Sequence, residues 1–197
     1  MTKRILLFRH GEIEGGTQNI CAGSTDAFLD PEGIRTSLAN IEFACRQGLD
    51  YVATSGKKRT RLPGIHLQRH EGIPHFAVPL FNERDFGERW EGKQWLDILR
   101  HSREEVARWL RDPLHAPIEG AEPAHRMRER VLEGWLGVLR DDFDCVALWG
   151  HALPFSTILN DIEGAERWQL QQRLSCMHEV VIENDTPRIV RANEVLY

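Results

Sequence analysis

The feature that most constrains this chain is the apolar run at residues 5–8. It leads directly into Arg9, His10 and Gly11. Such a run is typical of a central strand buried on both faces, and strands of this kind deliver catalytic side chains at their carboxyl ends. Glycine lets backbone N–H groups approach a ligand, arginine offers a planar fork of donors for phosphate, and an unprotonated imidazole is a nucleophile. The junction therefore indicates phosphoryl transfer through histidine, with a plain strand-to-loop exit as the alternative.

Length and composition exclude several classes of protein. A chain of 197 residues can form one α/β domain that buries roughly 70% of its unfolded surface, so it needs no metal or disulfide to fold. Its four cysteines are far apart, and it begins without the pattern of a signal peptide. It has no apolar stretch near the roughly 20 residues of a membrane span, and its net charge is −5. We expect a cytoplasmic protein that binds neither membrane nor nucleic acid.

The rest of the chain alternates predicted strands and helices. Short β-rich or apolar runs predict strands at 50–54, 75–78 and 144–149, and a terminal hairpin at 177–183 and 188–195. Capping signals and apolar spacing predict helices at 31–48, 93–100, 104–111, 124–139, and from the residues after 151 to about 172. Another helix should begin in the basic segment near Lys57, where Pro63 and Gly64 would break or kink it early. This order predicts a three-layer α/β/α sandwich on a mostly parallel sheet with an antiparallel edge.

Three later segments carry further groups that can handle phosphate. A basic segment that includes Arg59 follows the strand at 50–54, Glu83 lies in a predicted loop, and His151 follows the strand at 144–149. The carboxyl ends of parallel strands lie side by side, so these distant residues can converge. Each also has a structural alternative. Arg59 can lie on a solvated helix face, Glu83 can be a surface carboxylate, and His151 can be a partly buried core residue.

Taken together, four motifs resemble the histidine phosphatase superfamily, which contains cofactor-dependent phosphoglycerate mutases and many small phosphatases. They are residues 7–12 around Arg9 and His10, the element from Ser55 to Arg59, the acid loop at 83–92, and His151. Their order and spacing match the family over most of the chain. The resemblance implies a phosphoglycerate mutase-like fold that forms a single domain over 1–197, with a lid-like insert at about 79–123.

The resemblance also implies roles for these residues. His10 corresponds to the nucleophile that forms a phosphohistidine, and Arg9, Arg59 and His151 correspond to groups that surround the transferred phosphoryl oxygens. No metal or other cofactor is implied. Further contacts with the substrate are expected from small or polar residues. These are Gly11, Thr17, Asn19 and Ala152.

Glu83 corresponds to the acid that protonates the leaving oxygen and then deprotonates water. Glu88 and Glu91 lie in the same loop and remain open alternatives for this role. The tryptophans of the insert can stack on a substrate ring or pack the insert down, and packing is the better expectation for large aromatic side chains.

Several positions depart from the family pattern. Gly16 replaces a common asparagine, so that Thr17 or Asn19 would supply the polar contact, and the usual glycine pair after His151 is missing. Residues 90–95 and 119–122 resemble the small phosphatase branch that includes α-ribazole-phosphate phosphatases.

The sequence therefore predicts a metal-independent phosphomonoesterase that acts on a small phosphorylated metabolite. A phosphoglycerate mutase-type phosphotransferase and a non-catalytic phosphate-binding module remain the alternatives.

Overall fold

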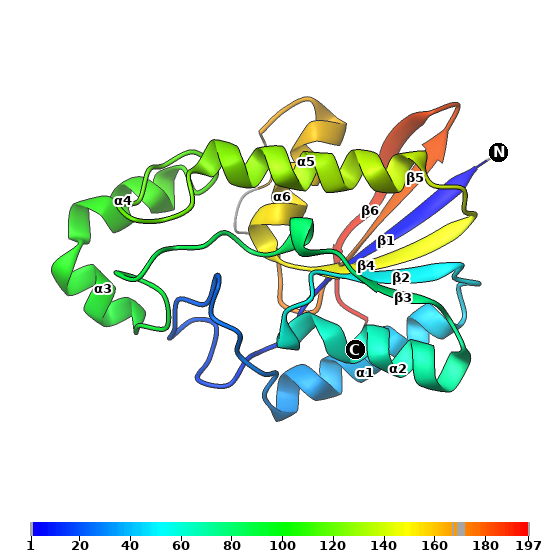
Figure 1. Ribbon diagram of the computed structural model, residues 1–197, viewed down its shortest axis with the longest axis horizontal. Coiled ribbons are helices and arrows are strands. Elements are labelled where there is room, and N and C mark those ends of the chain that lie inside the picture. Colours follow the sequence, from blue (N-terminus) through cyan, green and yellow to red (C-terminus); the bar gives the residue numbers. More distant parts are fainter. Residues whose placement is uncertain (1, 167, 169–171, 197) are drawn as a thin grey trace.

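The computed structural model of the chain describes residues 2–166, 168 and 172–196. The described strands form a six-stranded sheet in the order β3-β2-β4-β1-β5-β6 (Figure 1). Neighbouring strands among β1–β4 are parallel, whereas β5 is antiparallel to both β1 and β6. The strands are β1 (Lys3–Arg9), β2 (Tyr51–Thr54), β3 (His75–Ala77), β4 (Cys145–Gly150), β5 (Met177–Glu183) and β6 (Thr186–Glu194). The predicted parallel sheet with an antiparallel edge is confirmed.

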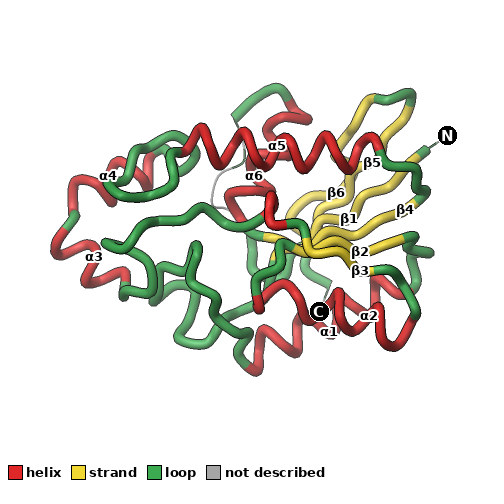
Figure 2. Tube along the Cα trace, viewed as in Figure 1, coloured by secondary structure: helices red, strands yellow, loops and turns green. Residues whose placement is uncertain are grey.

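Helices cover both faces of this sheet, as Figure 2 shows. One face carries α1 (Pro31–Cys45) and α2 (Lys58–Glu71), and the other carries α5 (Ala124–Arg140) and α6 (Ala152–Glu163). The predicted three-layer α/β/α sandwich is therefore confirmed. None of the described helices is long and apolar enough to cross a membrane.

The central strand β1 explains why the molecule has two cores. Ile5 and Leu7 point into the core beneath α5 and α6, whereas Leu6 and Phe8 point into the core beneath α1 and α2. All four side chains are fully buried, because successive residues of a strand face opposite sides of the sheet. An apolar run without alternation is therefore what this strand requires.

The course of α2 corrects one prediction. The helix runs without a break through Pro63, which lies in its second turn, so the expected early end is wrong. Proline removes one backbone donor, but the helix is retained by its packing against β2 and β3. Gly64 has a packing role there, because a Cβ atom at this position would collide with the ring of His75.

The helix after β4 is shorter than predicted. It ends at Glu163, where Gly164 adopts a left-handed conformation with φ of +64°. Glycine is the residue that takes this conformation without strain, and it stops the helix. The predicted helix to about 172 is therefore wrong at 164–166, at 168 and at 172, while 167 and 169–171 lie outside the described residues.

The segment at 79–123 lies beyond the carboxyl ends of the parallel strands (Figure 1). It contains the short helix η1 (Pro79–Phe81), α3 (Trp95–His101) and α4 (Arg103–Arg111). Trp90 and Trp109 are buried, and they pack edge to face with ring centroids 5.9 Å apart. Trp95 stacks on Trp109 at 5.3 Å. These contacts favour the interpretation that the tryptophans hold the segment together.

Candidate active site

The two predicted catalytic histidines follow neighbouring parallel strands. Arg9 lies opposite Gly150 in the pairing of β1 with β4, so the next residues along each strand, His10 and His151, come side by side. Their ring centroids are 5.2 Å apart. The backbone N–H of His10 also donates to the carbonyl of Gly150 at 3.1 Å. The sheet register thus brings together two residues that are 141 positions apart in the sequence.

The surroundings of His10 hold its ring in one chemical form. Its Nδ1 lies 2.7 Å from the carbonyl oxygen of Gly11. A carbonyl can only accept, so Nδ1 carries the hydrogen and Nε2 keeps its lone pair. Burial, together with the charges of Arg59 and Arg9, holds the pKa of His10 well below its ordinary value. A neutral ring with a free Nε2 is the form of histidine that attacks phosphorus.

Gly11 has a second reason to be glycine. A Cβ atom here would lie 2.6 Å from Cα of Gly33 and 2.7 Å from its carbonyl oxygen, at the start of α1. Asp30 caps that helix by accepting from the N–H of Gly33 at 2.7 Å. The loop after β1 and the first turn of α1 are therefore in direct backbone contact, which fixes the loop that carries His10.

Arg59 is buried with 1% of its surface exposed, so the solvated-face alternative is wrong. Its Nε donates to Nδ1 of His151 at 3.3 Å. Nδ1 of His151 is then an acceptor, and the hydrogen of that ring is on Nε2, which lies 2.7 Å from Oγ of Ser55. Burial, followed by the nearby charge of Arg59, holds the pKa of His151 well below its ordinary value. Ser55 also lies 2.9 Å from Oγ1 of Thr60.

Three of the four remaining N–H donors of Arg59 bind a loop. Its Nη atoms donate to the carbonyls of Ala22, Gly23 and Thr25 at 2.9, 2.8 and 2.7 Å. Lys57 supports the same loop through Nζ, which donates to the carbonyl of Ser24 at 2.6 Å. The basic cluster that the sequence places at the start of α2 therefore binds the loop that borders the histidines.

Arg9 is anchored by a residue that the sequence analysis missed. Its Nη1 donates to the carbonyl of Gln172, while its buried Nε has no partner among the described residues. The side-chain amide of Gln172 donates to the carbonyl of Ala152 and to Oγ of Ser156, both at 2.8 Å. Nε2 of His178 lies 3.2 Å from Oε1 of Gln172. Motifs give no signal for Gln172 or His178, because both act through buried contacts that only the fold creates.

Glu83 lies beside the start of α6, next to His151. Its Oε1 accepts from the N–H of Arg84 at 2.9 Å, and its Oε2 accepts from the N–H of Leu153 at 3.3 Å. Burial raises the pKa of Glu83, although these two hydrogen bonds and the charges of Arg59 and Arg9 oppose that effect. A carboxyl group with a raised pKa holds its proton to higher pH than an ordinary glutamic acid does, which suits a group that protonates a leaving oxygen.

The two other carboxylates of the acid loop have different surroundings. Glu91 accepts from the N–H groups of Ser24, Thr25 and Phe86 and from the hydroxyl of Thr25, at 2.7–2.9 Å. Both of its oxygens are thus occupied in joining two loops. Glu88 is exposed to solvent. The raised pKa of Glu83 and its position beside the start of α6 favour Glu83 as the proton donor.

Two of the predicted substrate contacts have other partners in the structure. The N–H and hydroxyl of Thr17 both donate to the carboxylate of Glu12. The carbonyl of Asn19 accepts from the N–H of Trp95 at 2.8 Å. Asn19 borders a cavity of about 280 Å³. The remaining lining residues are Gly15, Gln18, Ile20, Gln94, Trp95 and Leu96. A contact of Thr17 or Asn19 with substrate remains a prediction.

Comparison with known proteins places this arrangement in a family. The model of the histidine phosphatase superfamily (branch 1) matches residues 5–195. Phosphoserine phosphatase 1 of Hydrogenobacter thermophilus is 22% identical over 165 residues, which cover 83% of this chain and 77% of that protein. The 2,3-bisphosphoglycerate-dependent phosphoglycerate mutase of Nitratidesulfovibrio vulgaris (strain DP4) is 30% identical over 140 residues, or 64% of this chain. The match spans only 54% of that mutase.

A solved structure shows the same fold. The α-ribazole phosphatase from Shigella flexneri superposes with a TM-score of 0.82 at 20% identity. The superposition covers 97% of this chain and 96% of that one. The phosphoglycerate mutase-like fold expected from the motifs is therefore confirmed.

Proposed function

The chain belongs to branch 1 of the histidine phosphatase superfamily, and from that membership we propose that it is a metal-independent phosphomonoesterase for a small phosphorylated metabolite. The observation that carries this proposal is the state of His10. Its ring is neutral and buried, its Nδ1 is bound to the carbonyl of Gly11, and its Nε2 is left as a nucleophile beside two arginines. The relatives named as phosphatases support hydrolysis as the reaction.

The first step transfers the phosphoryl group to the enzyme. Nε2 of His10 attacks phosphorus, and the bond from phosphorus to the ester oxygen breaks. Arg9, Arg59 and His151 surround the transferred group and stabilise the charge that develops on its oxygens. Glu83 gives its proton to the leaving oxygen, so the alcohol departs neutral. The products of this step are phosphohistidine, the free alcohol and ionised Glu83.

The second step returns the enzyme to its starting form. Ionised Glu83 removes a proton from water, and the resulting hydroxide attacks phosphorus as the bond to Nε2 breaks. Inorganic phosphate leaves, and Glu83 is again protonated. The same carboxyl group serves both steps because its proton is lost in the first and regained in the second.

A phosphoglycerate mutase-type phosphotransferase is the second candidate. It is favoured by the 30% identity to a mutase, but the chain spans about half of that protein. The two functions differ in what happens to the phosphohistidine. A mutase must protect it from water, whereas a phosphatase hydrolyses it. Release of inorganic phosphate from an ester without any acceptor present is therefore the discriminating measurement.

The proposed function can be tested by assaying phosphate release from an activated aryl phosphate in the presence of a chelator. Steady release of phosphate is expected, and the same rate should be measured without the chelator. Binding of phosphate without turnover would instead support a non-catalytic phosphate-binding module. Loss of activity with the chelator and its return with a divalent metal would contradict the histidine mechanism. Phosphoserine and α-ribazole phosphate should be the first natural esters assayed, because relatives are named for them.

The cytoplasmic location remains part of this proposal. It is supported by the four cysteines, which are all unpaired in the structure. Buried thiols such as Cys21 and Cys176 fit a reducing compartment, where disulfides are rare. Fractionation of cells that express the tagged chain would test the location directly.

A further inference from the structure

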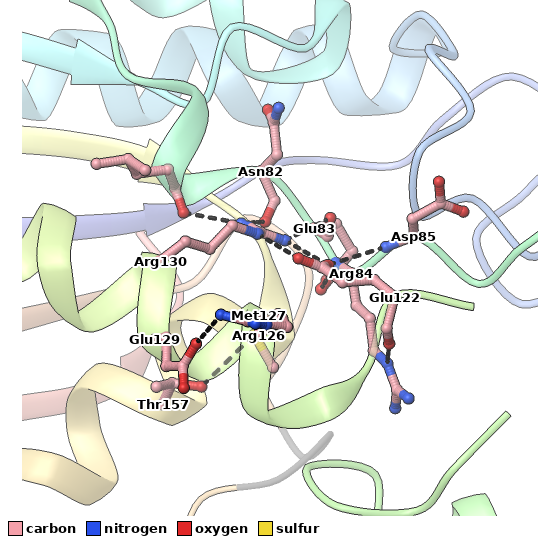
Figure 3. Close-up of polar contacts among 11 residues, drawn as sticks. Asn82, Glu83, Arg84, Asp85, Glu122, Arg126, Met127, Glu129, Arg130 and Thr157 are labelled. Atoms are coloured by element: carbon pink, nitrogen blue, oxygen red, sulfur yellow. Dashed lines mark hydrogen bonds and ion pairs between the residues drawn. The ribbon is translucent and has the colours of Figure 1, made fainter. Parts of the chain in front are cut away.

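Arg130, on α5, lies away from the strand ends and forms a dense set of hydrogen bonds to the loop that carries Glu83. A guanidinium has five N–H donors, and here each one is used (Figure 3). Nη1 donates to the carbonyls of Leu80 at 2.8 Å and Asn82 at 2.7 Å, and Nη2 donates to the carbonyl of Glu83 at 3.2 Å. Nε and Nη2 form a paired interaction with the two oxygens of Glu122, at 2.6 and 2.8 Å. Arg130 thus binds the backbone on which the proposed acid is carried.

Glu122 binds the same loop from its other side. Its N–H donates to the carbonyl of Asp85 at 2.8 Å, and its own carbonyl accepts from Nε of Arg84 at 2.9 Å. Its carboxylate also accepts from the N–H of Asp85 at 3.4 Å. Arg84 is completely buried and donates further to the carbonyl of Ala116 at 3.1 Å. The backbone from 82 to 85 is therefore held at both ends by one connected set of charged groups.

Most of the hydrogen bonds of Arg130 go to backbone carbonyls and not to side chains. Among the described residues, Glu122 is the one side chain that Arg130 binds, and its other partners are the carbonyls of the segment that leads into Glu83. The Arg130 and Glu122 side chains are 21% and 18% exposed, so water competes only weakly for them. Within the described part of the chain, the carboxylate of Glu83 is attached to the rest of the site by one hydrogen bond, which it accepts from the N–H of Leu153. The position of its carboxyl group relative to His10 therefore depends on the loop backbone.

We propose that Arg130 and Glu122 are positioning residues for Glu83: they fix the loop backbone so that its carboxyl group reaches the leaving oxygen. This inference rests on the proposed function. A small displacement of a catalytic group lowers the rate steeply, because proton transfer needs the donor within hydrogen-bond reach. The planar fork of arginine matches both the carbonyls and the carboxylate, and lysine cannot reproduce it.

The test compares leaving groups in Arg130→Lys, Arg130→Met and Glu122→Gln. An alkyl phosphate needs a proton on its leaving oxygen, whereas an activated aryl phosphate does not. We expect kcat/KM for the alkyl ester to fall by about ten- to a hundredfold in each variant, with a change of less than about threefold for the aryl ester. Arg130→Lys should lose less than Arg130→Met, because it keeps the charge.

Arg126 offers a matched control on the same helix, one turn before Arg130. Both Arg126 and its partner Glu129 are exposed, and they pair at 3.0 Å. Figure 3 shows this pair. Arg126→Lys and Arg126→Met should leave both esters at the native rate. A selective loss in the Arg126 variants as well would overturn the inference, because it would then follow from any change on α5.

The pH profile gives a readout that a general loss of structure would not produce. In the native enzyme, burial of Glu83 delays its ionisation. If the loop loosens, water reaches the carboxyl group and its ionisation moves to lower pH. The alkaline limb of the kcat profile for the alkyl ester should therefore shift toward acid in the Arg130 and Glu122 variants. An unshifted profile together with equal losses on both esters would overturn the inference.

Two results separate this inference from the proposed function. If the native enzyme releases no phosphate from the aryl ester, the proposed function fails and this inference fails with it. If Glu83→Gln loses alkyl-ester activity selectively and the Arg130 and Glu122 variants do not, only this inference fails. Circular dichroism should verify folding, and if Arg130→Met does not fold, the milder Arg130→Lys and Glu122→Gln decide the test.

Discussion

The histidine pair and the acid loop are held in place in different ways. His10 and His151 follow adjacent strands, so the sheet register sets their distance, while the carbonyl of Gly11 orients the ring of His10 and Nε of Arg59 orients that of His151. Glu83 lies on an irregular loop whose backbone carbonyls are bound by Arg130, 47 residues later in the chain. The distance between the two histidines is thus set by regular secondary structure, whereas the backbone of the acid loop is held by charged side chains from another element.

This difference predicts which substitutions should lower the activity through each region. The histidine pair should be disabled only by changes to the groups that touch the phosphoryl oxygens, because the strands below them form the core. The acid loop should be sensitive to distant substitutions, because its bonds to α5 are few and polar. The substitutions below test that contrast in order of decreasing effect.

Replacement of His10 should have the largest effect. His10→Ala removes the nucleophile, so turnover and the covalent intermediate should both be lost. Native enzyme quenched rapidly into alkali during turnover should retain phosphate on His10, because a P–N bond survives in base and is hydrolysed in acid. His151→Ala should mainly slow the labelling step. Phosphate that survives acid, or that maps to Ser55, would contradict the mechanism.

Glu83→Gln should lower kcat for an alkyl phosphate by about 10²–10⁴-fold and affect an activated aryl phosphate far less. The pKa of Glu83 is raised by burial, so the native rate should decline as pH rises through that raised value and the carboxyl group loses its proton. The pKa of His10 is lowered, so the rate should persist as pH falls below 6.5. Burst kinetics measured across a range of pH would follow both the alkaline decline and the activity at acid pH.

In Glu83→Gln the alkaline decline should disappear. The exposed Glu88 is the control, and Glu88→Gln should keep the native profile. Equal losses of Glu83→Gln on both esters would refute the role of Glu83 as the acid. Glu91→Gln should be assayed beside Glu83→Gln and Glu88→Gln. It should mainly lower the free energy of unfolding, because Glu91 joins two loops through four hydrogen bonds.

Arg59→Ala should cost about 10²–10³-fold in kcat, the usual loss when one donor to a developing charge is removed. The effect should be similar for alkyl and aryl esters, because Arg59 acts on the transferred group and not on the leaving oxygen. Arg61→Ala, on the exposed side of the same helix, should have no effect. A folded Arg59→Ala enzyme with native turnover would limit Arg59 to its bonds with Ala22, Gly23 and Thr25.

Ser55→Ala should have the smallest effect. The hydroxyl lies 2.7 Å from Nε2 of His151, and loss of one such bond costs about 0.5–1.5 kcal/mol, or up to about tenfold in the rate of phosphoenzyme formation. Single-turnover labelling would measure it. Ser102→Ala is a suitable control, because the hydroxyl of Ser102 binds exposed Arg89. A loss as large as that of Arg59→Ala would show that Ser55 touches the substrate.

The comparison also shows what could be predicted from the sequence. The junction of an apolar run with Arg9 and His10 is a local signal, because a strand buried on both faces must be apolar throughout and must end where polar groups begin. The second junction, at His151, follows the same rule. Parallel pairing then brings the strand ends together, so the proximity of the two histidines could be expected before the structure was known.

Predictions failed where tertiary contacts override local preference. Pro63 predicts a broken helix, yet α2 continues because its packing against the sheet outweighs one missing donor. Gln172 was expected inside a helix, but it lies after the end of α6 and binds Arg9 from there.

The sequence by itself therefore determined the layer order, the strand ends and the identity of the charged groups, because these depend on patterns of adjacent residues. Only the tertiary structure distinguishes the surroundings of the three carboxylates and shows what holds the acid loop in place. The family resemblance points to Glu83 and leaves Glu88 and Glu91 as alternatives; in the structure, burial raises the pKa of Glu83, whereas Glu91 joins two loops through its hydrogen bonds. Arg130 and Glu122 bind the loop across tens of residues, and no local pattern encodes a bond between a side chain and a distant carbonyl.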